Sequence, residues 1–205
     1  MGKIWLSLAA LCLALPVFGA LAPAKAEDAA PALSPDDRVL GKADAPITIF
    51  EYASLTCPHC AEFDRETLPK IKEAWIETGK AKLIFRDFPL DGTALRAAMV
   101  ARCAPPERYF AFVDTLFQSQ SAWARNDWEP GLSRIAKLGG MSEEQFKKCL
   151  TDQELGNAIV ASRTTATDTY KVESTPTFFI NGTRFVGAQP YEAFDKALTA
   201  ALPKS

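Results

Sequence analysis

The sequence is poor in the residues that usually build metal sites. It has 205 residues but a single histidine, His59, and five cysteines. A structural zinc site needs four ligands, usually two CxxC pairs or one pair with two histidines. Only one CxxC pair, Cys57 and Cys60, is present, so zinc would have to recruit Cys103 and Cys149. We therefore expect no metal site, and a Ser-His-Asp triad is excluded unless His59 serves it.

Neither sign of charge is in excess, because 23 Lys and Arg stand against 25 Asp and Glu, for a formal net charge of −2. A basic surplus is typical of proteins that bind nucleic acid, so we expect no such partner. Long apolar runs are also missing after residue 26, and a spanning helix needs about 20 apolar residues. We therefore expect the mature protein to be soluble.

Residues 1–26 have the pattern of a secretory signal peptide. Lys3 gives a positive start, residues 4–18 are almost wholly apolar, and Ala24-Lys25-Ala26 offers the small residues that signal peptidase recognises. A membrane anchor is the alternative, but the apolar run is short and contains Pro16. We predict that residues 1–26 are cleaved. Residues 27–38, rich in Ala, Pro and acidic side chains, are then a disordered leader.

Cleavage also sets the cysteine count of the mature chain. Cys12 leaves with the signal peptide, and four cysteines remain. An even number of cysteines in an exported protein permits disulfides. Because Cys57 and Cys60 can pair with each other, we predict a structural disulfide between Cys103 and Cys149. Two buried free thiols are the alternative.

The residues around the CxxC pair predict a βαβ unit. Residues 46–53 are apolar and β-branched, as in a strand buried on both faces, and residues 81–88 form a second predicted strand. From Pro58 to Trp75 apolar residues recur at spacings of three and four, and Gly79 ends this helix. Asp64 is expected at a solvated position of the helix. The CxxC pair thus lies where a strand meets a helix.

Residues 91–170 contain no convincing strand and predict a helical insertion. Strands return at residues 177–180 and 183–186, on either side of Asn181-Gly182, the strongest short signal for a hairpin. A last helix is predicted over about residues 191–201, directly after Pro190. The predicted helices of the insertion span residues 93–104, 107–118, 130–138, 143–150 and 154–170.

The position of Cys57 favours redox chemistry. The thiolate is the attacking species, and Cys57 directly precedes the helix that Pro58 opens, where free N–H groups and the helix dipole stabilise negative charge. His59, in the same turn, can add a hydrogen-bond donor or a positive charge near the sulfur. Cys60, one turn into the helix, should be the more buried sulfur, with the higher pKa. Because a stabilised thiolate stabilises the reduced pair, we expect a donor of disulfides rather than a reductant.

These features resemble the thioredoxin-like thiol–disulfide oxidoreductases and, among them, the DsbA family. The resemblance covers about residues 39–198 and rests on FEYASLTCPHCAEF, on the helical insertion and on ESTPTFFING before the hairpin. It implies an α/β, thioredoxin-like fold with an inserted helical subdomain, in one domain over residues 39–203, and it implies no cofactor. The CPHC motif is associated with periplasmic oxidases of that family, so a periplasmic location is also implied.

The resemblance assigns roles to three further residues. Family members place a cis-proline beside the CxxC pair in space, and Thr175-Pro176 matches it. Thr175 would then pair its backbone with an extended substrate peptide, as in β-augmentation. An ordinary trans proline that opens a strand is the alternative. Glu51, six residues before Cys57, matches a buried acid that takes the proton of the resolving thiol, unless it faces water at the end of its strand.

We therefore predict a monomeric enzyme that oxidises newly exported, reduced or unfolded proteins through Cys57 and Cys60. Reoxidation would come from a membrane partner of the DsbB type. A disulfide isomerase or sulfenic-acid reductase of the same fold is the nearest alternative. Such relatives usually carry an N-terminal oligomerisation segment, and residues 27–40 are too short and Pro-rich for one. A copper-handling thiol protein or a chaperone is an alternative of another class.

Overall fold

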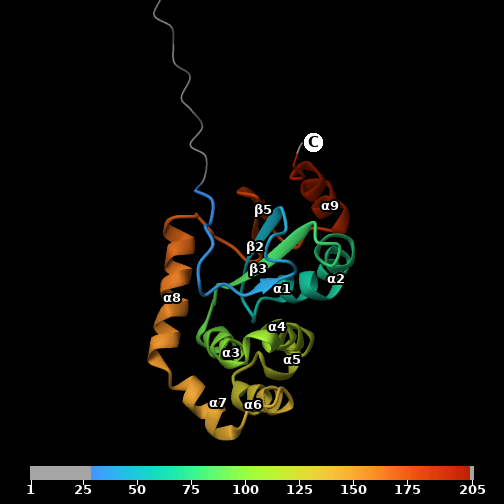
Figure 1. Ribbon diagram of the computed structural model, residues 1–205. Helices are drawn as coiled ribbons and strands as arrows, with labels where there is room; N and C mark the ends of the chain where they lie inside the picture. Colours follow the sequence, from blue (N-terminus) through green and yellow to red (C-terminus); the bar gives the residue numbers. More distant parts are fainter. Residues whose placement is uncertain (1–28, 204–205) are drawn as a thin grey trace, which may run out of the picture.

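The computed structural model describes residues 29–203 and contains a five-stranded mixed sheet of order β1-β3-β2-β4-β5 (Figure 1). β2 and β3 are parallel, and the other neighbouring strands are antiparallel. The predicted α/β architecture is confirmed, but the two-residue strand β1 was missed. The strands are β1 (Val39–Leu40), β2 (Ile47–Ala53), β3 (Ala81–Asp87), β4 (Thr177–Ile180) and β5 (Thr183–Val186).

β2 lies at the centre of the sheet because both of its faces carry apolar side chains. Ile49 and Ala53 belong to the large core that also contains Cys60, whereas Phe50 and Tyr52 belong to a smaller core on the opposite face. Side chains alternate along a strand. Glu51 therefore lies on the face of Ile49 and Ala53, toward the core that contains Cys60.

The helical segment that begins inside the CxxC pair contains two π-helical turns. It consists of α1 (Pro58–Glu62), a π-helical turn (Phe63–Thr67), α2 (Leu68–Ile71) and a second π-helical turn (Lys72–Ile76). The N–H of Leu68 donates to the carbonyl of Phe63, five residues back, and Pro69 has no N–H to offer. The helix was predicted over the right residues, but as one regular helix. Asp64, expected in solvent, is buried inside the first π turn.

The helical subdomain runs from Gly92 to Asp168, between β3 and β4. Figure 1 shows it below the sheet, with α8 returning alongside the sheet. The four-residue helix α5 was not predicted, and a short 3₁₀ turn (Pro106–Arg108) precedes α4. The remaining helices are α3 (Gly92–Cys103), α4 (Tyr109–Gln118), α5 (Gln120–Trp123), α6 (Trp128–Leu138), α7 (Glu143–Leu150), α8 (Gln153–Asp168) and α9 (Tyr191–Ala200).

The turn between β4 and β5 follows from its two central residues. Asn181 has a φ of 44° and Gly182 a φ of 88°. Positive φ at both positions is the requirement of a type I′ turn, whose twist matches that of a hairpin. The Asn181 side chain also accepts a hydrogen bond from the N–H of Thr48, at 2.8 Å, and so ties the turn to β2.

The described part of the predicted leader, residues 29–38, contacts strand β3. The Arg86 guanidinium on β3 donates to both carboxylate oxygens of Asp37, at 3.0 and 2.8 Å, and to the carbonyl of Ala32. Both partners of the Arg86–Asp37 ion pair are almost fully buried. The composition of the leader gives no sign of this buried ion pair with β3.

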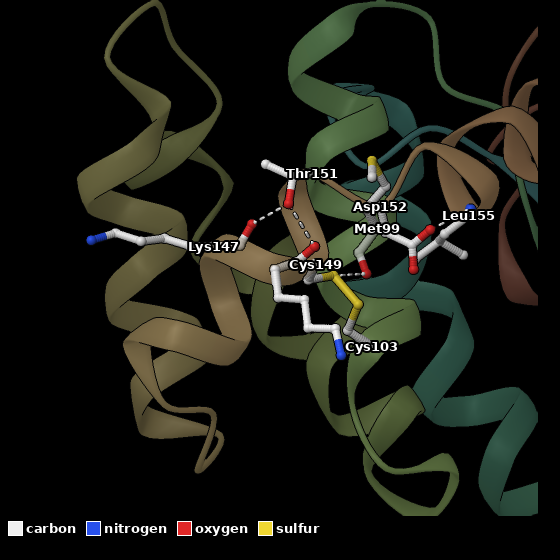
Figure 2. The surroundings of a disulfide bond; sticks show 8 residues. Met99, Cys103, Lys147, Cys149, Thr151, Asp152 and Leu155 are labelled. Atoms are coloured by element: carbon white, nitrogen blue, oxygen red, sulfur yellow. Dashed lines mark hydrogen bonds between the residues drawn. A yellow bond between two sulfur atoms is a disulfide. The ribbon is translucent and has the colours of Figure 1, made fainter.

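A disulfide joins Cys103, the last residue of α3, to Cys149 in α7 (Figure 2). The two Cα atoms are 6.2 Å apart, and 46 positions separate the two residues in the sequence. Cys149 is buried, and its sulfur lies 2.9 Å from the carbonyl oxygen of Met99. The bond therefore links the first helix of the subdomain to α7, around the segment that contains α4, α5 and α6.

The predicted signal peptide, residues 1–26, lies outside the described residues. Within residues 29–203, no helix has both the length and the apolar character needed to cross a membrane.

Candidate active site

Cys57 is the N-cap residue of α1, at the end of the loop that follows β2. Its backbone is extended, with φ −76° and ψ 122°, and Pro58 occupies the first helical position. Proline suits this position because it has no N–H to leave unpaired and its φ is already helical. The N–H groups of His59 and Cys60 are consequently directed at the sulfur of Cys57.

Several hydrogen bonds stabilise the Cys57 thiolate. They lower the pKa of Cys57 to about 5, with the largest contribution from the Cys60 thiol and smaller ones from Thr175 and from the N–H groups of Cys60 and His59. Burial opposes them, because it disfavours charge. Cys57 is only 6% exposed, so little of its side chain is open to solvent. Cys60 is 0% exposed and is therefore the more buried of the two cysteines, as expected.

We expect the reactivity of reduced Cys57 to follow this pKa. The rate of alkylation by iodoacetamide should be half its plateau value near pH 5 and should fall about tenfold for each pH unit below that, because only the thiolate reacts. Absorbance at 240 nm, read against the oxidised protein, reports the same titration. A midpoint near the ordinary thiol pKa of about 8.5 would contradict this arrangement.

Cys60 and Glu51 lie in the core, and both resist ionisation. Burial is the main cause that raises the pKa of Cys60, and the charges of Cys57 and Glu51 add to it. Glu51 is 2% exposed, and its pKa is raised well above the ordinary value, chiefly by burial and next by Asp64. Glu51 therefore does not face water. It is a buried acid close enough to Cys60 for their charges to interact.

The imidazole of His59 does not have the contacts that were expected. Its side chain is 74% exposed, and Nδ1 lies 3.2 Å from Oε2 of Glu62. The contribution of His59 to the thiolate comes from its backbone N–H. That contribution depends on the position of the residue in the first helical turn rather than on the identity of its side chain.

Thr175 and Pro176 lie directly beside Cys57. The Thr175-Pro176 bond is cis, and the Cys57 thiol donates to the carbonyl of Thr175 at 3.4 Å. The Thr175 hydroxyl is buried and has no hydrogen-bond partner among residues 29–203 of this dithiol form. It is therefore free to donate to the sulfur once Cys57 ionises, and this contact helps to lower the pKa of Cys57.

A buried acidic group next to Glu51 was not predicted. Asp64, 7% exposed, has a pKa raised to about 7, mainly by burial and next by the charge of Asp114 on α4. Lys72 partly offsets both effects, since its ammonium lies 3.0 and 3.3 Å from the Asp114 carboxylate oxygens. Neighbouring carboxylates repel one another when all of them are ionised. This cluster of acids can therefore hold a proton near neutral pH.

The helical subdomain reaches the loop before Cys57 through Asp91. One carboxylate oxygen of Asp91 accepts from the N–H of Ala94 and caps α3, and the other accepts from the Thr56 hydroxyl at 2.7 Å. The Thr56 hydroxyl also lies 3.1 Å from that of Ser54. An aspartate before a helix signals a cap, but its second bond to Thr56 joins residues 35 positions apart and leaves no local signal.

Within residues 29–203, no group of three or more His, Cys, Asp or Glu side chains is arranged to hold a metal ion. The site consists of the Cys57 thiolate, the buried Cys60 thiol, the buried acid Glu51 and the backbone of Thr175. These groups are suited to thiol–disulfide exchange.

Comparison of the sequence with known proteins supports the family that its motifs resemble. The Thioredoxin family model matches residues 33–200. A Rickettsia bellii protein, provisionally named a protein-disulfide oxidoreductase, is 34% identical over 172 residues, which are 83% of this chain and 64% of that protein. A Bacillus anthracis protein, provisionally named disulfide bond formation protein D, is 31% identical over 173 residues, 80% of this chain and 78% of that protein.

Solved structures agree with this assignment. Wolbachia pipientis α-DsbA1 superimposes with a TM-score of 0.79 and 36% identity, over 82% of this chain and 92% of that one. Oxidised BdbD from Bacillus subtilis gives 0.73 and 26% identity, over 81% and 92%. The chain spans slightly less than two thirds of the Rickettsia bellii relative, whereas it matches the DsbA structures over nearly their whole length. The chain therefore belongs to the DsbA-like family of thioredoxin-fold protein-disulfide oxidoreductases.

Proposed function

We propose that this protein donates disulfide bonds to reduced or unfolded exported proteins through Cys57 and Cys60. The observation that carries the proposal is the stabilised Cys57 thiolate at the start of α1, next to a buried Cys60. Stabilising that thiolate stabilises the reduced pair, so the disulfide form becomes the stronger oxidant. The direction of transfer follows from this difference between the two forms.

The proposed reaction begins with the Cys57–Cys60 disulfide. A substrate thiolate attacks the sulfur of Cys57, a mixed disulfide forms, and Cys60 leaves as a thiolate. A second substrate thiolate then attacks the substrate sulfur of the mixed disulfide and releases Cys57, which leaves readily because its pKa is low. Two electrons pass from the substrate to the protein. The backbone of Thr175 would hold the substrate segment in an extended conformation during these steps.

Glu51 is the proposed proton carrier for Cys60. The leaving Cys60 thiolate is buried and unstable as an anion, and a protonated Glu51 can supply its proton. We expect Glu51→Gln to slow mixed-disulfide formation by about a hundredfold, the lower end of the contribution that a positioned acid usually makes. Rapid mixing of the oxidised variant with a reduced peptide measures this rate.

Glu66→Gln is the matched control, because Glu66 is an exposed acid on the helical segment that contains Cys60. Its rate should equal that of the unchanged protein. Equal rates for Glu51→Gln and Glu66→Gln would rule out the role of Glu51.

The location and partners belong to the same proposal. Export through the signal-like segment of residues 1–26 would bring the protein to the periplasm, where disulfides persist. A membrane-bound protein of the DsbB type would reoxidise the reduced pair, and the protein would act as a monomer. The absence of a cofactor in the proposal follows from the chemistry, since the two sulfurs carry both electrons.

Oxidation of a reduced protein with several cysteines tests the proposed direction. The oxidised protein should introduce disulfides rapidly into reduced hirudin, and it should rearrange scrambled hirudin only slowly. Rapid rearrangement with little net oxidation would favour an isomerase instead. Stoichiometric copper retention by the reduced protein without any oxidase activity would point to a copper-handling protein.

A further inference from the structure

A glutamine of the helical subdomain binds the backbone on both sides of Thr56. The Gln120 amide nitrogen donates to the carbonyl of Leu55 at 2.8 Å and to the carbonyl of Cys57 at 3.1 Å. A primary amide has two N–H donors, and these two contacts use both. Because both partners are carbonyl oxygens, which only accept, the nitrogen and not the oxygen of the amide must face the loop.

α5 holds Gln120 in a fixed place. Trp123 on the same helix is fully buried, and its indole N–H donates to the carbonyl of Leu116 at 2.8 Å. A side chain that is positioned on an anchored helix loses little entropy when it binds. The loop before Cys57 is therefore held by the helical subdomain at two points, by Gln120 here and by Asp91 at Thr56.

The two carbonyls define the orientation of the peptide groups that flank Thr56 and Cys57. The carbonyl of Leu55 belongs to the peptide group before Thr56, and the carbonyl of Cys57 belongs to the one after Cys57. The Cys57 carbonyl also accepts the first helical bond, from the N–H of Ala61 at 3.2 Å. The position of the sulfur over the first helical turn depends on these planes, because the plane after Cys57 sets the ψ angle of Cys57 and the plane before Thr56 orients the residue that leads into it.

We propose that Gln120 is a positioning residue for Cys57, which fixes the carbonyls of Leu55 and Cys57 and so holds the sulfur over the N–H groups that stabilise the thiolate. This inference rests on the proposed role of Cys57 as the nucleophile. It gives the helical subdomain a part in the redox chemistry, in addition to covering the core.

Gln120→Met tests this proposal, because methionine has a similar length but cannot donate. The Leu55 carbonyl would lose its donor, and the Cys57 peptide plane would be held by the Ala61 bond alone. In the reduced full-length variant, we expect the midpoint of the thiolate titration at 240 nm to rise by about one pH unit. The equilibrium with glutathione should shift about tenfold toward the protein disulfide.

Gln118→Met is the matched control, because Gln118 is an exposed glutamine at the end of α4. It should leave both the titration and the equilibrium unchanged. Gln120→Glu provides a second variant of nearly the same shape, in which an acceptor faces two carbonyls. Its midpoint should rise at least as far as that of Gln120→Met.

A loss of stability in urea with an unchanged titration would mean that Gln120 only supports the fold, and would overturn the proposal. Equal shifts in the Gln118 and Gln120 variants would overturn it as well. The comparison is between variants and does not depend on the direction of disulfide transfer. The unchanged protein tests that direction separately, through its own equilibrium with glutathione.

Discussion

Replacing Cys57 with serine is expected to abolish disulfide transfer. The variant has no sulfur for a substrate thiolate to attack at the N-terminus of α1, and Cys60 is fully buried and cannot take over. We expect the oxidation rate of a reduced peptide to fall by on the order of a thousandfold or more, to the uncatalysed background. Stopped-flow measurement of peptide oxidation, with folding checked by circular dichroism, gives this rate.

Cys60→Ser separates the roles of the two sulfurs. The Cys57 thiolate of this variant can still attack a substrate disulfide and release one substrate thiolate. No Cys60 thiol is present to break the resulting mixed disulfide, so mixed disulfides with substrates should accumulate and be visible on a non-reducing gel. Accumulation of mixed disulfides in Cys57→Ser, with none in Cys60→Ser, would reverse the assignment.

The Cys103–Cys149 disulfide is expected to have the largest single effect on stability. It closes a loop with a sequence separation of 46 residues and joins α3 to α7. In the chain-entropy account, a closure of this length restricts the unfolded chain enough to stabilise the fold by about 4 kcal/mol. Cys103→Ala/Cys149→Ala should therefore lower the free energy of unfolding in urea by roughly that amount.

The disulfide is tested most simply in a protein without the active-site pair. The denatured, unreduced Cys57→Ser/Cys60→Ser variant, prepared from Glu27 onward, should contain no titratable thiol. Two thiols per chain would show that Cys103 and Cys149 are free. Peptide oxidation by Cys103→Ala/Cys149→Ala should remain close to that of the unchanged protein at a temperature where both are folded, because the bond lies outside the site.

The sequence was sufficient to predict the parts of the site that depend on local pattern. The place of Cys57 between a strand and a helix could be deduced from the apolar run before it and the helical spacing after Pro58. The direction of Glu51 could not be deduced, because β2 is buried on both faces and gives no alternation of polar and apolar residues. Only the pairing of β2 in the sheet decides which core receives the carboxylate.

Three other features could not be deduced because their causes lie far away in the chain. Asp64 is buried where a π turn interrupts the regular helical period, and it meets Asp114, which is 50 positions away. The helix that carries Gln120 has four residues, too few for a periodic signal, and its partners precede it by more than 60 positions. Strand β1 has only two residues, and it exists because it pairs with Leu83 and Ile84 of the distant strand β3.

The redox equilibrium between the Cys57–Cys60 pair and glutathione tests the central claim most directly. The claim is that the stabilised Cys57 thiolate makes the disulfide form a donor. We predict that low concentrations of reduced glutathione convert the pair to the dithiol, and that oxidised glutathione reoxidises it only in large excess. A pair that remains a disulfide in an excess of reduced glutathione would contradict the account, because such a pair is a reductant when reduced and not a donor of disulfides.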